Sequence, residues 1–230
     1  MNIFQKMADI FAKYHQMIFK GIGYTMLVSI IGTIIGLVIG LLIGVFRTMP
    51  TPKNKFLRVL KKAADWILSA YVEIFRGTPM MVQLLIMSMV IFANSRSFTM
   101  VGALTLGINS GAYVSEIIRG GLMAVDPGQM EAGRSLGLNY MTTMVVIIIP
   151  QAIRAVLPAL GNEFIILLKD TSLITVIGGK ELLYAAQGIM NRTYEAMFPL
   201  LGVALIYLVL VMLFTRLLAK FERRLAQSDR

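Results

Sequence analysis

The feature that most constrains the fold of this chain is an uncharged stretch of 26 residues, Gly21–Phe46. A helix needs about 20 apolar residues to cross about 30 Å of hydrocarbon, so this stretch alone predicts a membrane-spanning helix. The composition agrees, because 57% of the 230 residues are hydrophobic and only 15% are charged. A soluble domain of this size cannot bury so many apolar side chains in one core. The sequence therefore predicts an integral membrane protein.

Four further stretches are apolar enough to predict spans, which gives five in all. They cover residues 65–93, 98–118, 151–168 and 196–218, and the first of them is interrupted by Arg76-Gly77-Thr78-Pro79. Residues 171–195 contain Lys180 and Glu181. Their charges are costly in lipid, so we interpret this stretch as a re-entrant or interfacial segment. The predicted fold class is an all-α membrane protein with five transmembrane helices.

The distribution of basic residues predicts the orientation of these spans. The net charge is +10, and 14 of the 22 Lys and Arg residues fall on one side of the predicted membrane, with seven on the other and Arg76 inside a span. The positive-inside rule places the richer side in the cytoplasm, so the N-terminus is expected outside and the C-terminus in the cytoplasm. The positive charge is thereby explained as a topology signal, and no nucleic-acid partner is predicted.

Residues 1–20 precede the first span and are expected to form an amphipathic helix on the outer membrane surface. Apolar side chains recur there at helical spacing, with charged residues on the opposite face. An apolar core followed by a cleavage site of small residues is missing, which argues against a removed signal peptide. The predicted organisation is an interfacial helix (1–20), a transmembrane domain (21–218) and a basic cytoplasmic tail (219–230).

The first span also carries a glycine every fourth residue. These are Gly32, Gly36, Gly40 and Gly44. Such a stripe allows close approach to a neighbouring helix, either within this chain or in a second subunit. Packing within the chain is the preferred interpretation.

The residue types present limit the chemistry that this chain can perform. It has no cysteine and a single histidine, His15, which excludes disulfides, thiol nucleophiles and Cys-ligated clusters. No nucleotide phosphate loop is present, because Gly178-Gly179-Lys180-Glu181 lacks both the upstream glycine and the hydroxyl residue of that motif. We therefore expect no enzymatic activity, and no metal or cofactor in this chain.

The most informative segment is the loop between the third and fourth predicted spans, about residues 120–150. Asp126 and Pro127 predict the start of a short helix. Gly137 predicts its end, because glycine accepts a left-handed backbone, and Asn139 can cap a second helix. Short helices are unstable alone in water, so this helix–turn–helix is expected to dock on another protein. The alternative is an ordinary, well-capped loop.

The same loop resembles the EAA loop of bacterial ABC importer permeases. Glu131-Ala132-Gly133, then Gly137, Ile147, Ile149 and Pro150 follow that pattern, with Gly133 in place of a second alanine and Ile149 in place of leucine. Three other runs are similar to the polar amino acid branch of the family, which includes histidine, glutamine and arginine permeases. They are Phe75-Arg76-Gly77-Thr78-Pro79, Tyr113–Gly121 and Lys169-Asp170-Thr171-Ser172-Leu173. The resemblance covers about residues 20–220.

The resemblance implies a permease subunit of an ABC importer that moves polar amino acids, basic ones among the candidates, into the cytoplasm by alternating access. The implied location is the bacterial cytoplasmic (inner) membrane, as a multi-pass protein in contact with membrane lipid. The implied partners are a dimer of ATP-binding cassette ATPases, a second permease subunit that is identical or paralogous, and an extracytoplasmic amino-acid-binding protein. ATP and Mg would be bound by the ATPases.

The resemblance also implies that the EAA helix is a coupling helix that fits a groove on the ATPase. The coupling residues would be Glu131, Ala132, Gly133, Arg134 and Gly137. Glu131 and Arg134 would project charge, and Gly137 would supply the sharp turn.

Ionisable residues inside a predicted span are candidates for substrate binding. Glu163 and Asp170 are two helical turns apart, so both can face one way if the helix continues between them, and Asn162 and Lys169 have the same spacing. The carboxylates suit an ammonium group or a cationic side chain. Thr78, beside the break in the second span, is a candidate donor to the substrate carboxylate. The alternative role of the charged residues is internal pairing that only holds the helices together.

A rival interpretation is a self-sufficient ion channel or proton-coupled carrier that uses Glu163, Asp170 and Lys169 as a relay. Such a carrier would not require a docking loop. The loop therefore favours the importer.

Overall fold

The computed structural model describes residues 3–227, and every regular element in that range is helical. The helices are α1 (Ile3–Thr48), α2 (Lys55–Gly77), α3 (Met80–Ile86), α4 (Phe98–Ala124), α5 (Gly128–Ser135), α6 (Tyr140–Thr143), α7 (Ile149–Asp170), α8 (Leu182–Thr193) and α9 (Met197–Gln227). Two π-helical turns, Met87–Ile91 and Met144–Ile148, and a 3-10 helix, Thr171–Ile177, extend these helical stretches. No strand occurs in residues 3–227, so the predicted all-α fold class is confirmed.

Several helical stretches of the described chain are long and apolar enough to cross a membrane. Three of them, Met7–Thr48, Tyr140–Ile177 and Met197–Arg224, qualify alone. Lys55–Gly77 and Met80–Ile91 qualify only as a pair, bent by 108° at a break that lies where the sequence predicted it, which fits either a broken span or a re-entrant loop. The remaining predicted span is helical, in α4, but it is rich in small and polar residues, and many of these are buried. A helix surrounded by protein needs no continuous apolar surface, so the count of five spans stays a prediction.

The chain forms two compact units, each of which is described by itself. The first contains the described residues up to 35, 78–107 and 164–217, and the second contains 36–77, 108–163 and the described residues from 218 onward. One apolar core of the first unit surrounds Leu84 and Ile174, and another surrounds Ile189. The second unit has smaller cores, around Val72 and around Val156.

The glycine stripe of α1 packs against other helices of the same chain. In the second unit, a Cβ atom added to Gly40 would lie 2.4 Å from Val114 Cγ1 of α4, and one added to Gly44 would lie 2.8 Å from Ile118 Cβ. In the first unit, a Cβ added to Gly32 would lie 3.2 Å from Leu167 Cδ1. The preferred interpretation, close packing within the chain, is confirmed for these three glycines.

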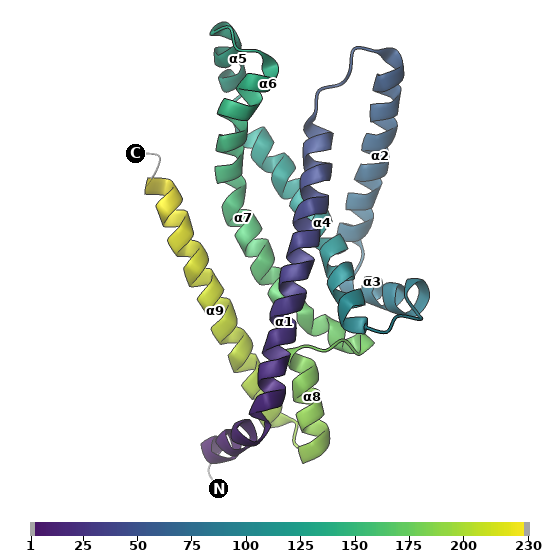
Figure 1. The fold of residues 1–230 in the computed structure, drawn as a ribbon, viewed down its shortest axis with the longest axis vertical. Coiled ribbons are helices and arrows are strands. Elements are labelled where there is room, and N and C mark those ends of the chain that lie inside the picture. The colour runs from purple at the N-terminus through teal and green to yellow at the C-terminus, as the bar shows by residue number, and fades with distance from the viewer. Residues whose placement is uncertain (1–2, 228–230) are drawn as a thin grey trace. The chain divides into compact units, whose positions relative to one another are not determined.

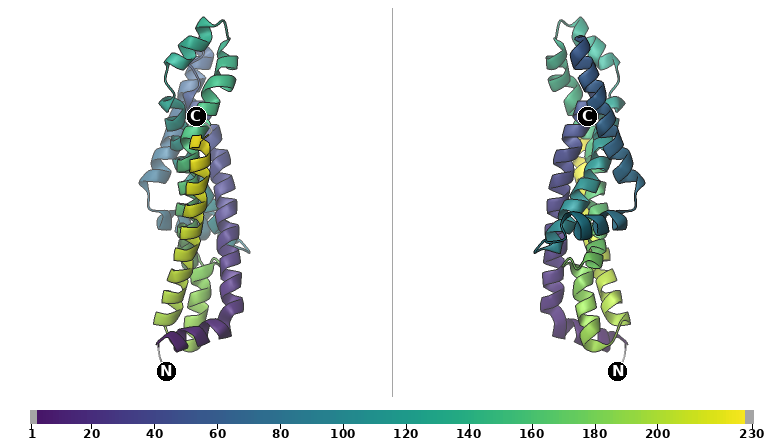
Figure 2. Two further views of the ribbon diagram at one scale, coloured as in Figure 1. Left: turned by 90° about the vertical axis from the view of Figure 1, so that its left-hand side faces the viewer. Right: turned by 90° about the vertical axis from the view of Figure 1, so that its right-hand side faces the viewer.

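The first turns of α1 do not continue straight into the rest of the helix. The backbone leaves the helical conformation at Tyr14 (φ −111°, ψ 15°), and Figure 2 shows from two sides that the preceding turns run across the helix that follows. Ile10 and Ile18, on either side of the bend, are buried in a core that includes Ile189 of α8 and Phe198 of α9. Part of the apolar face predicted for residues 1–20 thus packs on protein.

The segment after α7 contains Lys180 and Glu181, and it is folded around Glu181, the N-terminal cap of α8. This side chain is only 1% exposed, and its carboxylate accepts hydrogen bonds from the backbone N–H groups of Leu183 (2.7 Å) and Tyr184 (2.5 Å) and from the Thr175 hydroxyl. A buried carboxylate needs such partners, because it has lost its hydration. In the first unit, α8 lies beside the beginning of α1, as Figures 1 and 2 show.

Candidate functional site

The predicted helix–turn–helix is present in the second unit, where α5 and α6 meet at a tight turn (Figure 1). α5 begins after Pro127, and the Asp126 carboxylate accepts a hydrogen bond of 2.8 Å from the backbone N–H of Gly128. At its end Gly137 has φ +82°, and the next N–H, of Leu138, donates back to the Gly133 carbonyl at 3.1 Å. This left-handed termination is the one that glycine makes without a steric cost. The sequence prediction of the turn is confirmed.

The second short helix is also capped as predicted. Asn139 Oδ1 accepts hydrogen bonds from the backbone N–H of Thr142 (2.8 Å) and from its hydroxyl (3.0 Å). Gly133 is buried against α6, and a Cβ atom added there would lie 2.6 Å from Thr143 Cγ2. The substitution of glycine for the second alanine of the EAA pattern therefore has a local reason, which is the close contact between the two helices.

The outer surface of the α5–α6 hairpin (residues 126–143) combines charged and apolar side chains. Glu131, Ala132 and Arg134 are exposed. Leu136, which ends α5 and was not predicted as a functional residue, is 81% exposed, and Met141 is also exposed. A surface of this kind is typical of a docking site for another protein.

In the second unit, Glu163 is brought together with a residue that sequence reasoning missed. The buried Ser110 hydroxyl of α4 donates a hydrogen bond of 2.8 Å to Glu163 Oε1 of α7. A signal existed in the sequence, since Asn109 and Ser110 form a polar pair inside an otherwise apolar predicted span. Asn162, next to Glu163, is exposed.

The other three substrate-binding candidates lie in the first unit. Asp170 ends α7, so the helix does continue from Glu163 to Asp170, and its side chain is partly buried. Lys169 is exposed. Thr78 lies at the break between α2 and α3, where its carbonyl (3.1 Å) and hydroxyl (2.8 Å) oxygens accept hydrogen bonds from Gln83 Nε2. The role of all five candidates stays a prediction.

Two other charged groups of the second unit serve internal contacts. Glu116 pairs with Arg119 (2.8 Å) and also with Arg47 of α1 (2.7 Å). The Arg76 guanidinium lies 5.3 Å from the centre of the Tyr113 ring, a cation–π contact. These side chains hold helices together. Among residues 3–227, no three His, Asp or Glu side chains gather into a group that could hold a metal ion.

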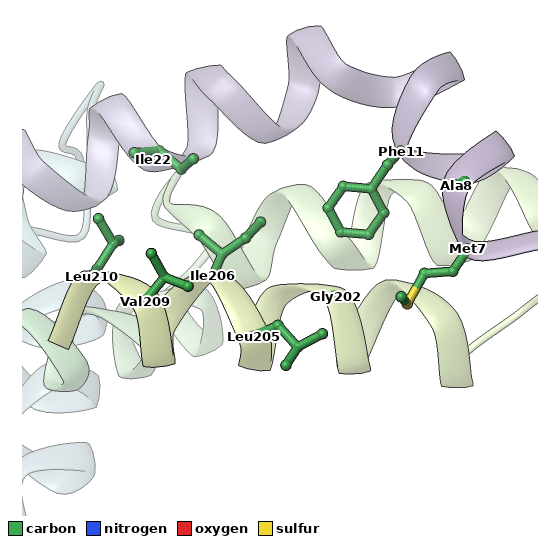
Figure 3. A pocket seen from close by; sticks show the side chains of 9 residues that line it. All are labelled: Met7, Ala8, Phe11, Ile22, Gly202, Leu205, Ile206, Val209 and Leu210. Atoms are coloured by element: carbon green, nitrogen blue, oxygen red, sulfur yellow. The ribbon is translucent and has the colours of Figure 1, made fainter. Parts of the chain in front are cut away.

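An apolar cavity of about 480 Å³ lies in the first unit between the first turns of α1 and α9. Figure 3 shows Phe11 pointing from the N-terminal turns of α1 towards Gly202 of α9. A Cβ atom added to Gly202 would lie 2.2 Å from the Phe11 ring, so this glycine permits the contact. A binding site for a polar substrate needs polar groups to orient it. The lining side chains, which include Met7, Ile22 and Ile206, offer none.

Known proteins resemble this chain closely. It is 41% identical over 182 residues to the putative glutamine transport system permease protein GlnP of Rickettsia bellii, which covers 76% of this chain and 79% of that protein. It is 40% identical over 169 residues to the arginine transport system permease protein ArtQ of Bacillus subtilis, covering 71% and 76% respectively. It is 37% identical, again over 169 residues, to the glutamine transport system permease protein GlnP of Escherichia coli, with coverage of 70% and 76%.

Solved structures share the fold. A chain from the crystal structure of an amino acid ABC transporter with histidines matches with a TM-score of 0.82 and 40% identity, over 93% of this chain and 96% of that chain. A chain of the MetNI methionine ABC transporter, only 20% identical, matches with a TM-score of 0.74 and covers 91% and 96%, a likeness of fold alone. The family model described as "binding-protein-dependent transport system inner membrane component" matches residues 36–227. The chain therefore belongs to the family of binding-protein-dependent transport system inner membrane components.

Proposed function

We propose that this chain is the permease subunit of an ABC importer that brings polar amino acids across the bacterial inner membrane into the cytoplasm. The family membership and the amino acid permeases among its relatives support the proposal. The rival interpretation, a self-sufficient channel or proton-coupled carrier, has no support among these relatives. Uptake assays with different labelled amino acids determine whether the substrate is glutamine, arginine, histidine or another polar amino acid.

The proposed topology has five spans, with the N-terminus outside, the C-terminus in the cytoplasm, an interfacial helix at residues 1–20 and a basic tail at 219–230. The support is the excess of Lys and Arg on one side of the predicted membrane. The proposed assembly contains a second permease, identical or paralogous, an extracytoplasmic binding protein and two ATPases that bind ATP and Mg. Substrate would pass at the interface of the permeases, with Glu163, Asp170, Asn162, Lys169 and Thr78 as the groups that bind it.

The observation that carries the proposal is the α5–α6 hairpin. Its caps and the Gly133 contact fix its shape, so a push on the exposed surface of Glu131, Ala132, Arg134 and Leu136 is transmitted to α7, which continues from α6 through one π-helical turn. We infer that closure of the ATPases on nucleotide moves this hairpin and thereby the spans. This chain would then provide the pathway for the substrate, whose spans move, and it would catalyse no covalent reaction.

The experiment is ATP-driven uptake of labelled glutamine and arginine into proteoliposomes that contain the permease, the ATPase and the binding protein. Glu131→Gln is expected to lower uptake by about tenfold, the scale of a typical coupling free energy, while the ATPase still turns over. The matched control is Asp9→Asn, an exposed carboxylate outside the hairpin. Unchanged uptake by the Glu131 variant, or the same loss in both variants, would argue against a coupling role.

A further inference from the structure

A second cavity of the first unit has a largely apolar wall with several polar side chains that the transport mechanism does not use. Its volume is about 230 Å³, and it lies between α1 and the segment that begins α8. Its polar side chains are Lys20, Tyr24, Lys180, Glu181 and Tyr184. Ammonium groups and phenol hydroxyls donate hydrogen bonds, and oxygen atoms of an anion are the acceptors that such donors prefer.

Within residues 3–227, no ion pair neutralises the lysines of this cavity, Lys20 and Lys180. Glu181 lies in the wall, but both of its oxygens are engaged elsewhere, by the N–H groups and the Thr175 hydroxyl described above and by the Tyr207 hydroxyl at 2.7 Å. Two lysines and one glutamate line the cavity, so its formal charge is positive.

The backbone that carries these groups is fixed before any ligand arrives. The N–H of Lys180 donates to Thr99 Oγ1 at 2.8 Å, and the N–H of Leu182 donates to Thr25 Oγ1 at 3.1 Å. A Cβ atom added to Gly21 would lie 3.0 Å from Leu182 Cα, so α1 and the start of α8 are already in contact. A site whose backbone is held in this way loses little entropy when it binds a ligand.

The position of the cavity favours a lipid as its ligand. Lys20 is the last charged residue before the uncharged stretch Gly21–Phe46, so under the proposed topology it lies at the outer boundary of the membrane. Tyr24 and Tyr184 are both exposed, and tyrosine is enriched at this boundary, where the ring meets hydrocarbon and the hydroxyl meets the headgroups. Basic pockets between membrane helices bind anionic headgroups on the cytoplasmic side of membranes, and the same charge attraction acts on an anionic lipid of the outer leaflet.

We propose that Lys20 and Lys180, with the hydroxyls of Tyr24 and Tyr184, bind the phosphate of an anionic phospholipid in the outer leaflet. The Gly178-Gly179-Lys180-Glu181 run, which is not a nucleotide loop, thereby acquires a role. Gly178 turns the chain with φ +77°, and the lysine that follows is presented to the lipid. The bound lipid would hold the extracytoplasmic ends of α1 and α8 together. The inference rests on the proposed membrane placement and adds a lipid site to the proposed function.

The test is native mass spectrometry of the purified full-length chain in detergent, titrated with phosphatidylglycerol or with zwitterionic phosphatidylcholine. The double variant Lys20→Gln, Lys180→Gln is compared with Lys13→Gln, which removes an exposed ammonium of the same helix outside this cavity. Attraction to anionic lipid is worth about 1 kcal/mol per basic residue, so the double variant is expected to bind phosphatidylglycerol about 30-fold more weakly, and the Lys13 variant about as tightly as the parent. Size-exclusion elution checks that each variant is folded.

Several results would overturn the proposal. Equal affinity of the parent and the double variant for phosphatidylglycerol would do so, and so would equal losses in the Lys13 and double variants, which would indicate a diffuse surface attraction. Displacement of the lipid by an equal concentration of inorganic phosphate would identify a free anion as the ligand. If the double variant kept its lipid affinity but lost ATPase stimulation by the binding protein, the ligand would be an acidic protein surface. Loss of lipid binding with normal uptake would leave the proposed function intact.

Discussion

Replacement of Gly40 by alanine tests whether the glycine stripe of α1 is a fixed packing surface. The added Cβ atom would lie 2.4 Å from Val114 Cγ1 and 2.9 Å from the backbone nitrogen of Ser115, whereas non-bonded carbon atoms prefer 3.5–4.0 Å. The valine can move only a little and the backbone of α4 cannot rotate away, so the two helices must separate by about 1 Å. Overpacking of this kind costs about 1–3 kcal/mol.

Helix propensity acts in the opposite direction, because alanine favours the helix over glycine by about 1 kcal/mol. Because the clash includes a backbone atom, Ser115 N, the overpacking cost is expected in the upper part of that range, about 2–3 kcal/mol, which leaves a net destabilisation of about 1–2 kcal/mol for Gly40→Ala. The matched control is Gly23→Ala in the same helix, where the new Cβ meets no heavy atom within 4 Å. It is expected to leave stability unchanged or to raise it by up to about 1 kcal/mol.

The assay is equilibrium unfolding in mixed micelles with increasing dodecyl sulfate, followed by far-ultraviolet circular dichroism of the helices. The parent, Gly40→Ala and Gly23→Ala are compared under one condition, so that differences in unfolding free energy are read directly. If Gly40→Ala were as stable as the parent, or if both variants changed stability equally, the close packing of α1 on α4 would not be the reason for the glycine.

Four further predictions concern single side chains. Gly137→Ala forces an L residue into a backbone with φ +82°, so it should destabilise the α5–α6 hairpin by about 1 kcal/mol and lower uptake, and hydrogen exchange of residues 126–143 that matched the parent would contradict this. Glu163→Gln should lower uptake of a basic amino acid more than it lowers basal ATPase turnover, whereas equal losses would indicate a structural residue. Ser110→Ala removes the donor to that carboxylate and should lower the unfolding free energy by about 1–3 kcal/mol, and an unchanged dodecyl sulfate midpoint would show that the bond is unimportant. Glu181→Gln loses acceptor capacity for hydroxyl and backbone donors, so it should lower the unfolding free energy by about 3 kcal/mol and with it the dodecyl sulfate midpoint. An unchanged midpoint would contradict this role of the buried network.

Local features of the fold were predictable where a single residue type determines the backbone. Gly137 permits a left-handed turn, Asn139 offers a cap, and the Gly77–Pro79 run disfavours a continuous helix. All three have the expected effect on the described chain. The EAA pattern also predicted the family to which the chain belongs, and the comparisons confirm that family.

The features that the sequence did not reveal depend on contacts between distant residues. Ser110 becomes a partner of Glu163 only because α4 and α7 meet in the second unit, 53 residues apart in sequence. From the sequence, the charge of Glu181 was expected to be unfavourable in lipid. In the fold, its carboxylate accepts hydrogen bonds from the hydroxyls of Thr175 and Tyr207. The span over residues 98–118 was predicted, but hydropathy did not show that several polar residues of α4 are buried in the protein.

The claim that the α5–α6 hairpin docks on an ATPase is tested most directly by cross-linking from Leu136, the exposed apolar residue at its turn. The chain has no cysteine, so Leu136→Cys provides one unique attachment point for a short photoactivatable cross-linker. The control is Tyr194→Cys, which is 95% exposed and lies on the opposite side of the proposed membrane. In inner membranes that contain the assembled transporter, the Leu136 variant is expected to cross-link to the ATP-hydrolysing subunit and the Tyr194 variant is not. If the Leu136 variant gave no such product, or if both variants gave it equally, the proposed coupling surface would be wrong.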